Sequence, residues 1–361
     1  MTWTGRLIVQ RWKGYENAQE RLRTLRVLNG LTQKEVAEVL GVGQSQYSQI
    51  EKGVRAFTPA HQSAAQFYFG VSAEFFMQPA VPYTTTSLNY RRRKLAARHM
   101  NMATATFGLT EQAVIGEGDK NHLDVLATEP VASRRSLHGI EKFAAETRDL
   151  IGIKSDAPIN NVTRCISSIG IIVTRLDNPK LPMDRIDGIS TPSLSSSPFV
   201  AALNYDVPGD RFRFSAAHEL GHIMMHSVGH DGSLADREAE ADMFASAFLL
   251  PREPMLDLLS PSLTLEGYAR LKAKWGVSVQ ALVRRAKDLD VIEAERYRSL
   301  MIQISSRGWR KNEPVFIPVE KPLGYPARLP FVGGFNHNRD DECAGAHGLS
   351  DDSDNVTALF G

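Results

Sequence analysis

The chain has 361 residues, of which 42% are hydrophobic and 23% are charged. These values are typical of soluble globular proteins and exclude wholesale disorder, collagen and coiled-coil structure, while the length indicates two or three domains. Cys165 and Cys343 are too few for a disulfide framework or a multi-cysteine zinc site, so any metal needs histidine and carboxylate ligands. No stretch approaches the 18 or so apolar residues of a membrane span and the first residues lack a signal core, so we expect a cytoplasmic protein.

Charge is distributed unevenly along the chain. Residues 1–100 carry 14 Lys and Arg against 6 Asp and Glu, whereas the remainder carries 28 against 35. A basic front part suggests a polyanion-binding module attached to a domain of another kind, although basic faces are often only solvated.

The first part of the chain reads as helical. From residue 17 to 69, apolar residues recur at helical spacing between glycines and a proline, which predicts four or five short helices in an all-α domain over residues 1–77. Residues 78–135 lack sustained periodicity and include the basic run Arg91–Lys94. We expect a linker there with one helix at most, and we interpret the basic run as solvated surface rather than a phosphate site.

The second part of the chain alternates helical and β-rich segments, which predicts an α+β domain over residues 136–310 that ends in helices. Strands are expected near 170–176, 187–190 and 198–204, and helices over 138–152, 159–169, 211–226, 236–250, 265–275, 278–288 and 292–305. The remaining residues, 311–361, are predicted to be a tail. From 331 onwards the tail has 1 Arg against 6 Asp and Glu, so we expect it to be partly disordered.

A helix-turn-helix pattern occupies the segment from Leu22 to Gly53. Thr32 and Glu35 have capping-box spacing at the start of one helix, and Gly41 permits a tight turn after it. The next helix, which Gly53 ends, carries polar side chains on its outer face that can hydrogen-bond base edges: Gln44, Ser45, Gln46 and Gln49.

This segment resembles the XRE family of phage-repressor-like helix-turn-helix domains over about the first 75 residues. The matching residues are Leu31–Gln33, Ala37, Leu40–Val42, Ser48, Ile50–Glu51 and Gly53. The resemblance implies contacts with double-stranded operator DNA, to bases from Gln44, Ser45 and Gln49 and to phosphates from Gln33 and Arg55. The alternative is an ordinary helical hairpin whose polar face meets only water.

Residues His218–His222 read His-Glu-Leu-Gly-His. On a helix, the two imidazoles lie four residues apart on one face, where both can bind one zinc ion. Glu219 then points towards the metal and can act as base, because zinc lowers the pKa of a bound water towards about 7 and hydroxide can attack a peptide carbonyl. The pattern also arises by chance, so a third ligand is needed.

A second predicted helix offers that third ligand. Glu238 and Asp242 share one face, where Glu238 could complete the zinc site and Asp242 could accept a hydrogen bond from a ligand imidazole. Glu240 competes with Glu238, but it lies about 200° around the helix, so only one of them can face the metal. His226 could tune the site, and we expect it not to be a ligand because the carboxylate helix fills that place.

The two helices resemble the ImmA/IrrE family of bacterial and phage metallo-endopeptidases. The matching residues are Arg211–His226 in the first helix, and Glu238, Ala241–Asp242, Ala245 and Leu249–Pro251 in the second. The resemblance covers roughly residues 136–310 and implies a zincin-like fold that binds Zn²⁺. It assigns the metal ligands to His218, His222 and Glu238, and the base to Glu219.

These patterns together predict a DNA-binding transcriptional regulator that carries a zinc-dependent endopeptidase. The resemblance implies a repressor-type protein as substrate, and this chain itself is a second candidate. Helix-turn-helix modules commonly bind two half-sites, so we also expect a homodimer. The alternative is a repressor or antitoxin-like protein whose zincin domain is a sensor or dimerisation body without turnover, although retention of Glu219 argues against it.

Overall fold

The structure is a computed structural model that describes residues 18–81, 83, 88–92, 95–117, 136–191, 199–226 and 233–321. It has an N-terminal helical domain followed by an α+β domain with a small sheet and C-terminal helices, as expected. In the described ranges, no helix combines the length and the apolar composition that crossing a membrane requires.

The N-terminal domain consists of α2 (Ala18–Leu28), α3 (Gln33–Val39), α4 (Gln44–Glu51) and α5 (Pro59–Phe69), followed by the 3₁₀ helix η1 (Ala73–Met77). The predicted capping box at the start of α3 is present, because Thr32 Oγ1 accepts from the Glu35 amide and Glu35 Oε2 accepts from the Thr32 amide. Gly41 has a φ of 66°, a left-handed conformation that favours glycine at the turn before α4. The helix-turn-helix prediction is confirmed in its elements and in its turn.

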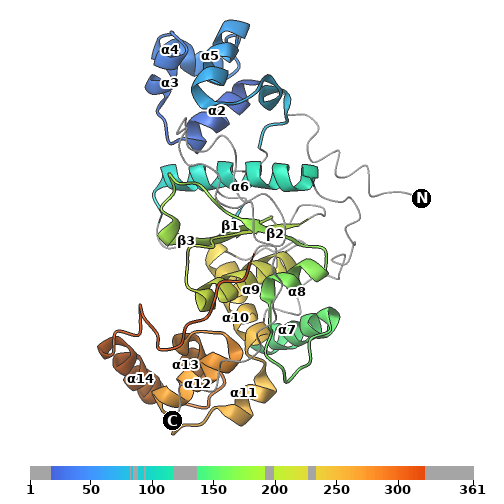
Figure 1. Ribbon diagram of the computed structural model, residues 1–361, viewed down its shortest axis with the longest axis vertical. Coiled ribbons are helices and arrows are strands. Elements are labelled where there is room, and N and C mark those ends of the chain that lie inside the picture. The colour runs from blue at the N-terminus through green and yellow to red at the C-terminus, as the bar shows by residue number, and fades with distance from the viewer. Residues whose placement is uncertain are drawn as a thin grey trace, which may run out of the picture.

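The stretch expected to be a linker contains two elements that pack into the fold. Strand β1 (Asn89–Arg92) pairs with β3 (Ile186–Ser190), and helix α6 (Ala97–Glu117) crosses between the N-terminal helices and the sheet (Figure 1). Every residue from Met102 to Glu111 is buried. A helix that is buried all round has no amphipathic stripe, which explains why periodicity did not reveal its packing role.

The sheet has four strands in the order β1, β3, β4, β2, where β2 is Ile172–Arg175 and β4 is Val200–Leu203. Strands β2 and β4 are parallel, and β3 runs antiparallel to both of its neighbours. Side chains on one face, such as those of Ile189 and Ala202, join a core with α6. Side chains on the other face, such as that of Leu203, join the main core with the helices below.

The helices on that second face are α7 (Leu137–Ile151), α8 (Val162–Ser168), α9 (Gly209–Met225) and α10 (Leu234–Leu249). In α9, 15 of the 17 residues are buried, so its polar side chains need partners inside the protein. Arg213 pairs with Glu320, and Asp210 pairs with Lys272. Helix α9 is therefore the central element of this domain and the rigid platform for the histidine motif.

The domain is completed by α11 (Arg252–Leu258), α12 (Leu265–Trp275), α13 (Val279–Asp288) and α14 (Ala294–Ser306) at the end opposite the N-terminal domain (Figure 1). Residues 311–321, expected as the start of a tail, are ordered against these helices. Glu313 Oε2 accepts from the Val279 amide at 2.8 Å, and Glu320 accepts from the Val162 and Thr163 amides at 2.9 and 2.8 Å. These carboxylates cap the starts of α13 and α8, which fixes the segment. The acidic stretch from 331 lies outside the described residues.

Buried polar contacts join the N-terminal domain to the sheet. Asn178 Nδ2 donates to Thr106 Oγ1 of α6 at 2.9 Å and to the Leu28 carbonyl at the end of α2 at 3.2 Å. Lys180 Nζ donates to Asn29 Oδ1 at 2.9 Å. The N-terminal helical domain is thus packed onto the second domain rather than carried on a free linker.

We expect Asn178→Ala to lower the free energy of unfolding by about 1–3 kcal/mol, because it leaves a buried carbonyl without its donor. Denaturant unfolding followed by fluorescence and by circular dichroism measures the change, with the exposed Asn160→Ala as control. An unchanged free energy of unfolding, or two separate transitions in the wild type, would contradict this account of the domain junction.

Candidate functional site

The crossing of α9 and α10 brings the predicted site residues together. Where the two helices meet, a Cβ added to Gly221 would lie 3.0 Å from Phe244 Cδ1 and 3.3 Å from the Ala241 backbone. The absence of a side chain at Gly221 therefore allows α10 to approach the motif closely. This approach places Glu238 opposite the two histidines of α9.

His218, His222 and Glu238 form a compact group of potential metal ligands. One ligand atom from each lies within 4.8 Å of the others. The Nε2 atoms of His218 and His222 are 3.0 Å apart, and Glu238 oxygens lie 3.2 Å from His222 Nε2 and 3.6 Å from His218 Nε2. Donor atoms around a tetrahedral zinc ion with bonds of about 2.0–2.2 Å are separated by about 3.3–3.6 Å. The three observed separations lie within about 0.3 Å of this range, so small shifts of the side chains would let them hold such an ion.

The protonation states of these groups also suit a metal. Burial lowers the pKa of His222 to about 4, so its imidazole is neutral at pH 7. Burial would raise the pKa of Glu238, but the neighbouring His218 and His222 side chains outweigh this effect and lower it to about 2. A neutral imidazole and a carboxylate are the forms that bind metal ions.

Asp242 lies where it can orient one of the histidines. Its Oδ1 is 2.8 Å from His218 Nδ1, and a carboxylate can only accept, so this ring nitrogen is the donor. The neutral ring then carries its lone pair on Nε2, the atom that faces His222. His218 thus presents Nε2 on the side of His222 and Glu238, where a metal ion would bind.

Glu219 is buried between α9 and strand β3. A Cβ added to Gly188 in β3 would lie 2.9 Å from both Cγ and Oε1 of Glu219. The glycine therefore lets the strand pass directly against the carboxylate and limits the positions that it can take. We did not single out Gly188 from the sequence, although a glycine inside a strand often marks such a close approach.

We expect Gly188→Ala to lower kcat of peptide cleavage by ~10- to 100-fold, since the added methyl displaces the Glu219 carboxylate from its position. Metal content should stay at the wild-type level, because the methyl does not touch the histidines. Steady-state kinetics with metal analysis of the same sample test this. Wild-type kcat in the variant would show that the position of Glu219 is not limiting.

Glu240 and His226, which were weighed separately as candidates, contact each other. His226 Nε2 lies 3.0 Å from Glu240 Oε2, and His226 Nδ1 lies 2.9 Å from His222 Nδ1. Among the described residues, the candidate metal group contains neither of them. Glu240 thus faces a histidine of α9 rather than the place between the three candidate ligands.

The predicted DNA-contacting residues lie at the opposite end of the molecule. Gln44, Ser45 and Gln49 are exposed on α4, and Arg55 is exposed just after it. Gln33 differs, since its Nε2 donates to Glu51 Oε2 at 2.9 Å and thereby links the start of α3 to the end of α4. The Gln33 side chain is half-buried and already hydrogen-bonded within the domain. Its contact with a DNA phosphate stays a prediction.

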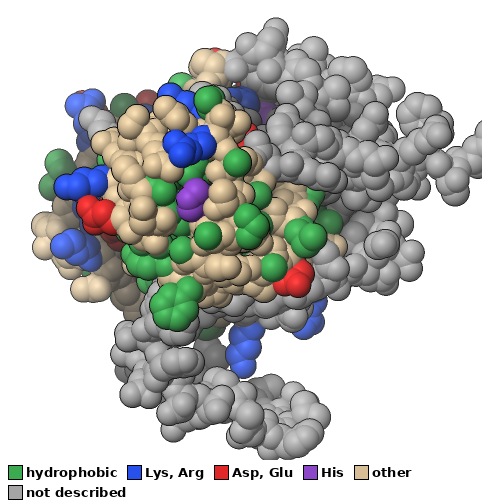
Figure 2. Space-filling model, turned by 90° about the horizontal axis from the view of Figure 1, so that it is seen from above, with side chains coloured by type: hydrophobic (Ala, Val, Ile, Leu, Met, Phe, Trp, Pro, Cys, Tyr) green, Lys and Arg blue, Asp and Glu red, His purple; other side chains and the backbone are tan. Residues whose placement is uncertain are grey.

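Figure 2 views the protein from the end of the N-terminal domain. Uncharged side chains occupy most of this face, Lys and Arg lie towards its edge, and few acidic side chains are visible. The exposed bases near α3 and α4 include Lys34, Lys52 and Arg55. Glu35 and Glu38 of α3 are exposed as well, so the bases that follow α4, Lys52 and Arg55, are the ones that favour the approach of a phosphate backbone.

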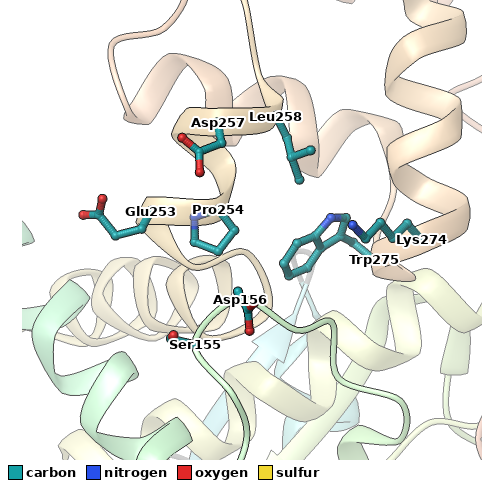
Figure 3. Close-up of a pocket in the computed structure, with 8 residues that line it drawn as sticks. All are labelled: Ser155, Asp156, Glu253, Pro254, Asp257, Leu258, Lys274 and Trp275. Atoms are coloured by element: carbon teal, nitrogen blue, oxygen red, sulfur yellow. The ribbon is translucent and has the colours of Figure 1, made fainter.

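A separate surface pocket of about 250 Å³ lies between α11, α12 and the loop after α7 (Figure 3). Its lining consists of Ser155, Asp156, Glu253, Pro254, Asp257, Leu258, Lys274 and Trp275. None of the candidate metal ligands belongs to this lining, and the volume is below the roughly 300–1,000 Å³ of typical ligand sites. The pocket is therefore not part of the site on α9 and α10.

Comparison with known families agrees with both parts of the structure. The helix-turn-helix family model matches residues 22–61, and the IrrE N-terminal-like domain, a metallopeptidase family, matches residues 172–287. The second match spans the strands β2 to β4 and the helices that carry the histidine motif and Glu238. A search of curated proteins found no match to the chain. The order of the two matches, a helix-turn-helix before a domain similar to the IrrE metallopeptidase family, supports a DNA-binding regulator that carries a peptidase-family domain.

Proposed function

We propose that the second domain is a zinc-dependent endopeptidase in which His218, His222 and Glu238 hold the metal and Glu219 is the catalytic base. The observation that carries this proposal is the group of three ligand atoms within 4.8 Å, with Glu219 on the same buried helix. Burial excludes bulk water and strengthens electrostatic interactions in the site. The family match supports the metallopeptidase chemistry, and zinc suits a set of two imidazoles and one carboxylate.

The residues of the chain divide the work of peptide hydrolysis between them. A bound zinc ion would supply Lewis acidity that polarises the scissile carbonyl and makes water acidic enough to deprotonate near neutral pH. The Glu219 carboxylate accepts that proton at one of its Oε atoms and returns it to the leaving nitrogen. Gly188 keeps β3 close to Glu219, and Asp242 holds the His218 ring in the tautomer that presents Nε2.

The N-terminal domain would bring this activity to DNA. In the proposal, Gln44, Ser45 and Gln49 of α4 read bases of double-stranded operator DNA in the major groove, and Arg55 and Gln33 contact phosphates. Two copies bind as a dimer on two half-sites. The substrate is a repressor-type protein, and its cleavage changes gene expression.

A second candidate function is a regulator whose peptidase domain senses a signal without turnover. The observation that favours it is the buried junction of α6, Asn178 and Lys180, which ties the DNA-binding domain to the sheet. Through such a junction, a change in the second domain can reach the helices that bind DNA.

Cleavage of protein substrates separates the two candidates. Purified zinc-loaded protein is incubated with helix-turn-helix repressor proteins and, separately, alone, and the fragments are identified by mass spectrometry. We expect a single cut in a repressor that disappears with a chelator. Intact substrates together with metal-dependent operator affinity would instead support the sensor.

A further inference from the structure

A third histidine, His226, follows the motif at the C-terminal end of α9. Its side chain is buried, and its ring lies between two partners from different helices. Nδ1 is 2.9 Å from His222 Nδ1, and Nε2 is 3.0 Å from Glu240 Oε2 of α10. Both ring nitrogens of His226 are thus engaged, one by a candidate metal ligand and the other by a carboxylate.

The donors and acceptors in this row can be assigned from their chemistry. The Glu240 carboxylate only accepts, so His226 Nε2 donates to it. In the neutral ring of His226, Nδ1 then has no hydrogen and accepts from His222 Nδ1. His222 therefore has its hydrogen on Nδ1 and its lone pair on Nε2, the atom that lies 3.2 Å from Glu238. The row selects the only neutral tautomer of His222 that can bind a metal through Nε2.

We propose that His226 and Glu240 are positioning residues that together fix the tautomer and orientation of His222 for metal binding. This inference rests on the proposed zinc site. In this arrangement each histidine ligand has its own carboxylate partner. His218 contacts Asp242 directly, whereas His222 is linked to Glu240 through the ring of His226.

Two orienting arms can be distinguished: the Asp242 arm, which contacts His218, and the His226 arm, in which His226 and Glu240 follow His222. They differ in their exposure to solvent. The Asp242 side chain is 57% exposed, whereas the Glu240 side chain is 12% exposed and that of His226 is fully buried. Water can replace a lost hydrogen bond at the exposed arm but has little access to the buried one. The His226 arm should therefore contribute more to metal affinity than the Asp242 arm.

Substitutions at His226 separate hydrogen bonding from packing. His226→Leu fills the space without polar atoms, whereas His226→Gln offers an oxygen that can accept from His222 and an amide that can donate to Glu240. Glu240→Leu tests the other end of the row and leaves the His226 ring itself unchanged. His138→Leu, at an exposed position of α7, serves as the control.

The measurement is the zinc dissociation constant, by competition with a chromophoric chelator, together with the absorption spectrum of the Co²⁺-loaded protein. We expect His226→Leu and Glu240→Leu to weaken zinc binding ~10- to 100-fold and to alter the Co²⁺ spectrum. His226→Gln should regain most of the affinity, and His138→Leu should match the wild type.

Other outcomes separate this inference from the proposed function. Wild-type affinity and spectrum in both leucine variants, or equal losses in His226→Leu and His226→Gln, would overturn the inference and leave the zinc site intact. A wild-type protein that binds no zinc would overturn both. Zinc binding with the expected losses but no peptide cleavage would support the inference and contradict the endopeptidase.

Discussion

Glu219→Gln should lower kcat for peptide cleavage by ~10²- to 10⁴-fold, because the amide cannot take the proton that the carboxylate accepts. The substitution changes almost no volume, which matters at a residue that is fully buried and packed against Gly188. The three candidate ligands keep their positions, so the variant should retain its zinc and its thermal stability. Kinetics on a cleaved repressor, with zinc analysis of the same sample, measure both quantities.

The control for this substitution is Glu295→Gln, which makes the same chemical change at an exposed position of α14. Its kcat should equal that of the wild type. If Glu219→Gln retained more than a tenth of wild-type kcat, Glu219 would not be the base, and another group would have to move the proton.

A triple substitution of Gln44, Ser45 and Gln49 by alanine should weaken operator binding by at least ~100-fold. Base contacts of this kind contribute about 1–3 kcal/mol each to discrimination. The three side chains are exposed on α4, and the inward-facing Tyr47 and Ile50 hold the helix in place, so the domain should fold normally. Binding to unrelated DNA should change much less, because phosphate contacts are retained.

Fluorescence anisotropy with operator and unrelated duplexes tests this prediction at several salt concentrations. Wild-type affinity should fall by on the order of a thousandfold between 50 and 200 mM salt if about six phosphates are contacted. Gln280→Ala in α13, at the far end of the molecule, is the control (Figure 1). Equal affinity of wild type and triple variant for the operator would show that α4 does not read bases.

Local signals predicted the N-terminal domain well. The capping box of Thr32 and Glu35 and the left-handed turn at Gly41 each depend on residues within a few positions of one another. The pairing of His218 with His222 is local too, since it follows from the helical repeat. Such features can be inferred from a single sequence because the chain around them decides their geometry.

Features that depend on distant parts of the chain were not predicted. Strand β1 pairs Asn89 with Ser190, about a hundred residues away, and no pattern within its four residues indicates that partner. Helix α6 is buried between two domains, so its sequence lacks the separate polar and apolar faces that mark a surface helix. Glu313 and Glu320 were assigned to a tail because single carboxylates give no signal of the helix starts that they cap.

The candidate site likewise combines features that local sequence predicts with features that depend on distant parts of the chain. The spacing of Glu238 and Asp242 on one helix indicated their roles, but the contact between His226 and Glu240 depends on how α9 crosses α10. Gly221 permits that crossing, and its importance emerges only once Phe244 and Ala241 are seen against it. Packing between helices thus decides which of the two carboxylates, Glu238 or Glu240, faces the candidate ligands His218 and His222.

The most direct test of the central claim is the metal content of the purified chain, with the position of the metal found by anomalous diffraction at the zinc edge. We expect one zinc per chain in the wild type and in Glu219→Gln, bounded by His218 Nε2, His222 Nε2 and a Glu238 oxygen, and none in His222→Ala. A wild-type protein without metal, or undiminished zinc in His222→Ala, would contradict the assignment of this site.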